Sequence, residues 1–132
     1  MNTSRDIALL SARPAVEADT QADEPGTAGH FLHTTLRPIL KLQNELLLQT
    51  WRLYSRKRKL NILQVPAEKR FSSIEACLRQ DTALRCTLIG QISGHFTREE
   101  WASYLTMEAE LNRRISSLLV QRFYDQVEDL LI

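Results

Sequence analysis

The stretch TLRPILKLQNELLLQTWRLYSRKRK, residues 35–59, indicates a helical protein. Its apolar side chains recur every three or four positions, which is the spacing of one face of an α-helix. Thr35 can cap the first turn, and Pro38 lies in that turn, where a missing backbone N–H costs little. Extra leucines widen the apolar face. We therefore expect a helix over residues 34–59 that contacts more than one neighbour.

A second helix is predicted over residues 66–93, because apolar residues again recur at helical spacing. Ser72 and Glu75 have the spacing of a capping box, in which each side chain satisfies a backbone N–H of the first turn. Gly94 is placed to end this helix in the left-handed conformation, which only glycine adopts without strain. We expect one uninterrupted helix between these signals.

The third predicted helix covers residues 97–131 and begins with the sequence FTREEW. Thr97 and Glu100 form a second capping box, while Phe96 and Trp101 occupy the two positions of a hydrophobic staple. An apolar face continues from there to the end of the chain. These local signals fix the start of the helix.

Three helices joined by short links predict an all-α fold, either an antiparallel bundle or a helical hairpin with a third arm. At 1.5 Å per residue, such helices reach roughly 40 to 50 Å. A rod of this shape exposes much surface for its mass, so we expect a homodimer. Leucine occurs 21 times and glycine and proline only four times each, which also favours helix over strand.

Residues 1–29 differ from the rest of the chain. They carry two basic and five acidic residues, net −3, and show no sustained apolar period. We interpret them as a flexible acidic arm outside a helical domain that spans residues 30–132. Residues 7–10, the sequence IALL, could form a short helix or a docking turn within the arm.

The location of the protein is predicted from what the sequence lacks. No apolar run is long enough for an export signal or a membrane-spanning helix. Cys77 and Cys86 lie nine positions apart on one predicted helix, roughly 13 Å along its axis, so they cannot form a disulfide. We expect a cytoplasmic protein with reduced thiols.

Charge is divided unevenly along the chain, although the net charge is only +1. Residues 37–85 hold 11 basic and 4 acidic residues, net +7, whereas residues 98–132 hold 4 basic and 7 acidic residues, net −3. Much of the positive charge lies at the end of the first predicted helix. The candidate patch for a partner or a phosphate consists of Arg52, Arg56, Lys57, Arg58, Lys59, Lys69 and Arg70.

Three explanations of this patch remain open, and one of them is contact with an anionic membrane surface. Cations at a helix C-terminus complement the helix dipole and need no ligand, or they serve for docking a protein. Alternatively, they bind the phosphates of a nucleic acid. Trp51 and Tyr54 lie on the apolar face of the same helix, which favours a place in the core over base stacking. A docking surface or a solvated helix end is therefore our first interpretation.

Motifs for catalysis are almost absent from the sequence. It has no glycine-rich phosphate loop, no nucleophile elbow and no CxxC pair. His30 and His33 are three residues apart but lack a further metal ligand nearby, and His95 follows a predicted helix end. An enzyme would need a pocket lined by Glu108, His95 or Cys86. We therefore predict no catalytic residues, no metal and no cofactor.

The sequence thus predicts a non-catalytic protein that binds another protein through its helical surfaces, as an adaptor, assembly factor or regulator. Long amphipathic helices and the divided charge support this interpretation. The alternative is a small nucleic-acid-binding transcriptional regulator that uses the basic end of the first helix.

Overall fold

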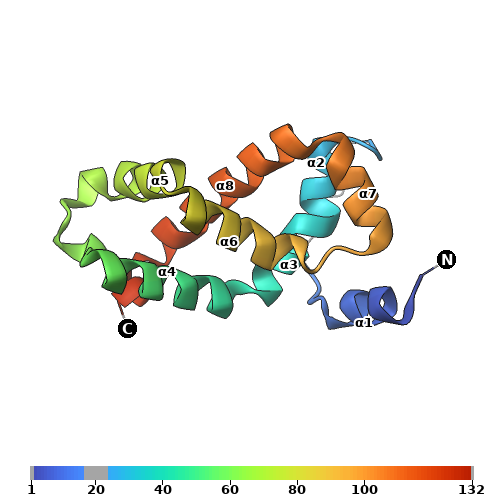
Figure 1. The fold of residues 1–132 in the computed structure, drawn as a ribbon, viewed down its shortest axis with the longest axis horizontal. Coiled ribbons are helices and arrows are strands. Elements are labelled where there is room, and N and C mark those ends of the chain that lie inside the picture. The colour runs from blue at the N-terminus through green and yellow to red at the C-terminus, as the bar shows by residue number, and fades with distance from the viewer. Residues whose placement is uncertain (1, 17–23, 132) are drawn as a thin grey trace.

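A computed structural model describes residues 2–16 and 24–131 of the chain, and every regular element in those ranges is a helix. The all-α prediction is confirmed, but the predicted helices are each divided into shorter ones (Figure 1). The elements are α1 (Ser4–Ala12), α2 (Ala28–Phe31), the π-helical turn η1 (Leu32–Leu36), α3 (Arg37–Leu42), α4 (Asn44–Arg58), the 3-10 turns η2 (Ile62–Gln64) and η3 (Ala67–Lys69), α5 (Arg70–Gln80), α6 (Thr82–Ser93), α7 (Arg98–Thr106), α8 (Glu108–Asp125) and the 3-10 segment η4 (Val127–Leu131).

The first predicted helix begins earlier than the sequence suggested. Thr27, and not Thr35, is the cap, since its hydroxyl accepts a hydrogen bond from the His30 N–H at 3.2 Å. Pro38 therefore lies inside a helical segment, where it cannot donate to the carbonyl four residues earlier. The turn just before it, η1, has the wider π-helical spacing, which accommodates the proline. At Gln43 the segment breaks, and α4 leaves in a different direction from α3 (Figure 1).

The second predicted helix is divided at Asp81. This residue is extended, with φ −100° and ψ 98°, and its carboxylate caps α6 by accepting from the Leu84 N–H at 3.0 Å. The predicted Ser72 capping box does not form, because α5 begins at Arg70. Gly94 is right-handed, with φ −60°, so the prediction of a left-handed glycine is wrong.

The third predicted helix starts as expected and then breaks. Thr97 and Glu100 form the capping box, with bonds of 3.2 Å and 2.9 Å between side chains and backbone N–H groups. Met107 then interrupts the helix, with φ −133°. The longest α-helix described, α8, has 18 residues and is about 27 Å long. No 40 Å rod is found among the described residues, so the homodimer stays a prediction.

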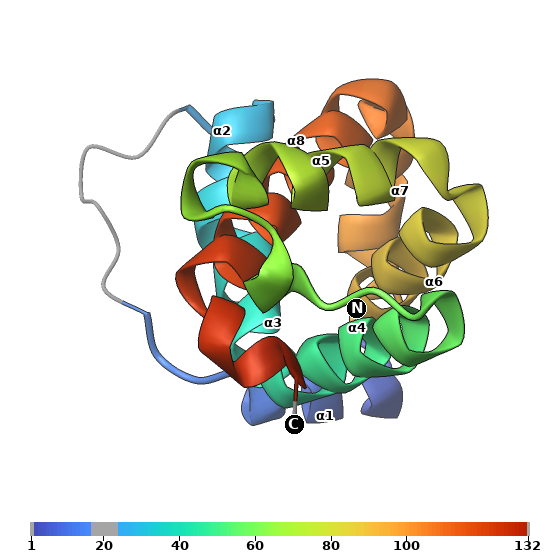
Figure 2. The same ribbon diagram turned by 90° about the vertical axis from the view of Figure 1, so that its left-hand side faces the viewer.

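One apolar core joins these helices. Helix α8 packs against α5 and α6, while η4, which follows α8 directly, packs against α4 (Figure 2). Trp51 of α4 lies at the centre and is fully buried, and its ring centroid is 5.3 Å from that of Phe123 on α8. The short helices are therefore held by tertiary packing more than by their own propensities.

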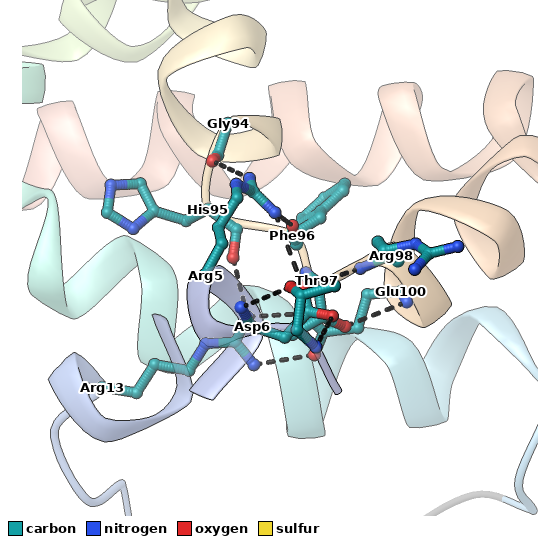
Figure 3. A network of polar contacts seen from close by, with 10 residues as sticks. Arg5, Asp6, Arg13, Gly94, His95, Phe96, Thr97, Arg98 and Glu100 are labelled. Atoms are coloured by element: carbon teal, nitrogen blue, oxygen red, sulfur yellow. Dashed lines mark hydrogen bonds and ion pairs between the residues drawn. The ribbon is translucent and has the colours of Figure 1, made fainter. Parts of the chain in front are cut away.

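Helix α1 lies at the edge of the molecule, where polar contacts fasten it to the turn between α6 and α7 (Figure 3). The Arg5 guanidinium donates to the carbonyls of Gly94 and Phe96 at 2.8 and 2.9 Å. A carboxylate oxygen of Asp6 accepts from the Arg98 N–H at 3.1 Å. Together these bonds satisfy backbone groups at the end of α6 and the start of α7.

An ion pair between Arg13 and Glu100 fastens the chain just beyond α1. Arg13 donates to both carboxylate oxygens of Glu100 at 2.6 and 2.7 Å, and also to the His95 carbonyl at 2.9 Å. The short helix that residues 7–10 could form is present as part of α1, and its Ile7 and Leu10 side chains are exposed. Residues 17–23, the most acidic part of the predicted arm, lie outside the described residues. The division of the chain at residue 29 stays a prediction.

Candidate functional site

Three cations of the predicted basic patch are engaged by the protein itself. Arg52 is 9% exposed, and its Nε donates to the Asp129 carbonyl at 2.8 Å. Arg58 pairs with Asp81 and lies over a tyrosine ring. Arg70 donates to two carbonyls of the loop before it, both at 2.9 Å. These side chains fix the end of α4 and the loop that follows.

The other four cations of the patch, Arg56, Lys57, Lys59 and Lys69, have exposed side chains. Lys59 ends α4 in the left-handed conformation, with φ 52°. Trp51 is fully buried, and Tyr54 is half-buried. Burial, together with Cys77 and Asp81 nearby, raises the pKa of Tyr54 to about 12. Neither ring is presented for base stacking, so this surface offers charge alone.

A groove of about 700 Å³ lies between α5, α6 and α8, and sequence reasoning did not find it. Its floor is apolar, built by the half-buried Ile89 and by the edges of Leu78 and Val120, which are 2% and 4% exposed. The full lining is Glu75, Leu78, Arg79, Arg85, Cys86, Ile89, Asn112, Arg113, Ser116, Ser117 and Val120. We refer to it as the α8 groove.

Three arginines and one acid line the α8 groove. Arg85 donates to the Leu78 and Arg79 carbonyls, both at 2.9 Å, which satisfies carbonyls at the end of α5 and holds its guanidinium in place. The Arg79 guanidinium and the Glu75 carboxylate are 3.9 Å apart and mostly exposed, so their pairing is weak. Arg113 is exposed on α8. The lining is therefore positive over an apolar floor.

A second concave surface lies on the other side of α8, against η1 and α3. This α3–α8 hollow has a volume of about 480 Å³ and is lined by Leu32, Arg37, Leu40, Leu118, Gln121, Arg122, Asp125 and Gln126. A shallower depression between Leu32 and Leu118 connects it to the region of Arg113 and Ser117, which also line the α8 groove. Helix α8 is thus flanked on both sides by surfaces that contain arginine.

The residues considered for an enzyme are not brought together. Cys86 is exposed in the α8 groove, but neither His95 nor Glu108 lines it. Glu108 is exposed in the first turn of α8. Burial lowers the pKa of His95, and the positive charges of Arg13 and Arg5 lower it further.

Among the described residues, no helix combines the length and apolar character that crossing a bilayer requires. Comparisons with protein-family models, with curated proteins and with solved structures find no match to this chain.

Proposed function

We propose that the protein is a non-catalytic adaptor or regulator that binds an acidic amphipathic helix of a partner protein in the α8 groove. The observation that carries this proposal is the combination of an apolar floor with three lining guanidiniums. Apolar grooves between helices are a common way for proteins to bind a partner helix. Charged residues around such a groove select the partner and speed its association.

The groove indicates the chemistry of its occupant. Its floor favours a helix that presents leucine-like side chains at positions i, i+3, i+4 and i+7. Arg79, Arg85 and Arg113 favour glutamate or aspartate beside that apolar stripe, since they outnumber the single carboxylate of Glu75. Arg85 contributes at little entropic cost, because two backbone carbonyls already orient it.

The test uses synthetic peptides of about 18 residues, or five helical turns. One peptide carries a leucine stripe flanked by glutamates, and the second peptide carries the same stripe flanked by lysines. We expect the acidic peptide to bind at low ionic strength and the basic one not to bind, as measured by fluorescence anisotropy. The double variant R79Q/R113Q should lose roughly tenfold or more in affinity, since each arginine contributes a charge-assisted contact.

A matched control removes two charges elsewhere. Arg56 and Lys57 are exposed on α4 and do not line the α8 groove, so R56Q/K57Q has the same net charge as the groove variant. An equal loss of affinity in both variants would show unspecific attraction and contradict the proposal. Binding of the acidic and the basic peptide alike would also contradict it.

The alternative from the sequence, a nucleic-acid-binding regulator, is tested in the same assay with a labelled DNA duplex. Its supporting observation is the four exposed cations Arg56, Lys57, Lys59 and Lys69. Salt-sensitive DNA binding that R56Q/K57Q weakens more than R79Q/R113Q would favour the alternative. The homodimer and the cytoplasmic location expected from the sequence belong to the adaptor proposal.

A further inference from the structure

The α3–α8 hollow brings two guanidiniums together beside an apolar wall. Arg37 from α3 and Arg122 from α8 line it, with Leu32, Leu40 and Leu118 forming its apolar part. Its volume of about 480 Å³ falls within the usual range for small-molecule sites, roughly 300 to 1,000 Å³. It shares no lining residue with the α8 groove.

Neutral groups hold Arg122 in position. Its Nη1 donates to the Asn44 Oδ1 at 3.1 Å. The side-chain amides of Asn44 and Gln126 bond to each other through two hydrogen bonds of 2.8 Å, which fixes that acceptor. Arg122 is half-buried, and none of the ion pairs in the described part of the chain includes it. A half-buried charge held by neutral amides remains able to bind an anion.

Arg37 adds a second charge, and none of the ion pairs within residues 2–16 and 24–131 includes it. Its one described hydrogen bond is with the ring nitrogen Nδ1 of His33, at 3.4 Å. Burial lowers the pKa of Arg122 most, the charge of Asp125 raises it, and the charge of Arg37 lowers it by less than Asp125 raises it. The Asp125 carboxylate accepts from the Gln121 amide at 2.8 Å. The two guanidiniums therefore repel each other, and one acid in the hollow offsets only part of their charge.

We propose that the α3–α8 hollow binds a small phosphorylated molecule, with its phosphate between Arg37 and Arg122 and its organic part on the three leucines. Guanidinium groups bind phosphate through paired, charge-assisted hydrogen bonds. A phosphate monoester carries nearly two negative charges at neutral pH, which matches two guanidiniums better than a carboxylate does. The leucines give an organic substituent apolar surface to cover.

Isothermal titration calorimetry with three probes at constant ionic strength tests the phosphate preference. We expect phenyl phosphate to bind, inorganic phosphate to bind more weakly because it does not cover the leucines, and benzoate to bind least. Benzoate that binds as tightly as phenyl phosphate would overturn the choice of phosphate. Inorganic phosphate that binds as tightly as phenyl phosphate would overturn the role of the leucines.

Variants test the residues. R37Q should lower the affinity for phenyl phosphate roughly tenfold or more, because one charge-assisted contact is lost. It leaves the Asn44–Gln126 pair untouched, so it is safer for folding than R122Q. R56Q, which removes one charge from an exposed site elsewhere, should leave the affinity unchanged. Equal affinities for R37Q and R56Q would overturn the site.

D125N provides a test in the opposite direction. Removing Asp125, the one acid among the described residues that line the hollow, should raise the affinity for phenyl phosphate several-fold, since an anion no longer competes with that carboxylate. A purely structural role for Arg37 and Arg122 predicts no such gain. Unchanged or reduced affinity in a folded D125N protein would contradict the proposal, and circular dichroism at 222 nm verifies the fold.

Discussion

At the scale of single residues, the carboxylate of Asp6 decides where α1 lies. Its side chain is buried, which raises its pKa, but hydrogen bonds from the Thr3 and Arg98 N–H groups and from the Thr3 side chain lower the pKa by more. No other residue of α1 has a buried side chain. A helix that buries so little apolar surface depends on its polar contacts and opens more easily than the core.

Acid is therefore expected to release α1. The folded-state pKa values of Asp6 and Glu100 are depressed below their ordinary values of 3.8 and 4.5. For Glu100, burial raises the pKa, but hydrogen bonds and charge from Arg13, with bonds from Thr97 and Thr35, lower it by more. A carboxyl group whose pKa is lower in the folded than in the unfolded state stabilises the fold at pH values above the unfolded-state pKa. This stabilisation is lost as the pH falls through the folded-state pKa.

Hydrogen exchange of the α1 amides from pH 7 to pH 3 measures this release, after correction for the intrinsic exchange rate. We expect constant protection above about pH 5 and loss of protection below about pH 4. D6N should have low protection at every pH, whereas E99Q, which neutralises an exposed acid of α7, should behave as the unaltered protein. Protection in D6N equal to that of E99Q would show that Asp6 does not hold α1.

At the scale of elements, the sequence predicts helical segments better than their ends. Apolar periodicity identified the helical regions, and the Thr97–Glu100 capping box was predicted because all its groups lie within four residues. The break at Asp81 had a local signal, an aspartate that can cap a helix, but the periodicity continued across it. Gln43 and Met107 are not cap residues, so their breaks depend on tertiary packing that no local pattern contains.

The Asp81 side chain is expected to contribute to stability in two separable ways, as a helix cap and as an ion-pair partner. D81A removes the cap of α6 and the ion pair with Arg58, and we expect it to lower the free energy of unfolding by about 1 to 2 kcal/mol. D81N keeps a capping oxygen and loses only charge, so its effect should be smaller. R58Q should cost about 0.5 kcal/mol or less, because the guanidinium is 62% exposed.

Urea denaturation followed at 222 nm measures these three variants. The expected order of destabilisation is D81A, then D81N, then R58Q. If R58Q destabilised the protein as much as D81A, the ion pair and not the cap would hold the corner between α5 and α6.

At the scale of the whole molecule, the fold brings together arginines that lie far apart in the sequence. The segment from residue 98 onward is acidic in total, yet its Arg113 and Arg122 line the two surfaces beside α8. Arg79 of α5 and Arg85 of α6 line the α8 groove together with Arg113. Such a site cannot be predicted from spacing, because the three arginines of the α8 groove lie up to 34 positions apart in sequence and meet only through packing. The basic patch was visible in the sequence because five of its seven cations lie within the eight residues 52–59.

The core predicts how the molecule unfolds. One apolar cluster includes residues from α2 to η4, so loss of a central side chain should destabilise all these elements together. Phe123 is fully buried against Trp51, and F123A should lower the free energy of unfolding by about 3 to 5 kcal/mol. This is a large fraction of the roughly 5 to 15 kcal/mol that stabilises a typical domain. L105A, at a residue 50% exposed, should change it by about 0.5 kcal/mol or less.

Parallel urea titrations by circular dichroism and by tryptophan fluorescence test the cooperativity. In the unaltered protein the two signals should give one midpoint, because Trp51 in the core and Trp101 on α7 report tertiary packing and ellipticity reports the helices. F123A should shift both midpoints by the same amount. Separate midpoints would mean that α4 and α8 unfold independently of the other helices. Both surfaces beside α8 would then be lost together when α8 unfolds, since α8 forms a wall of each of them.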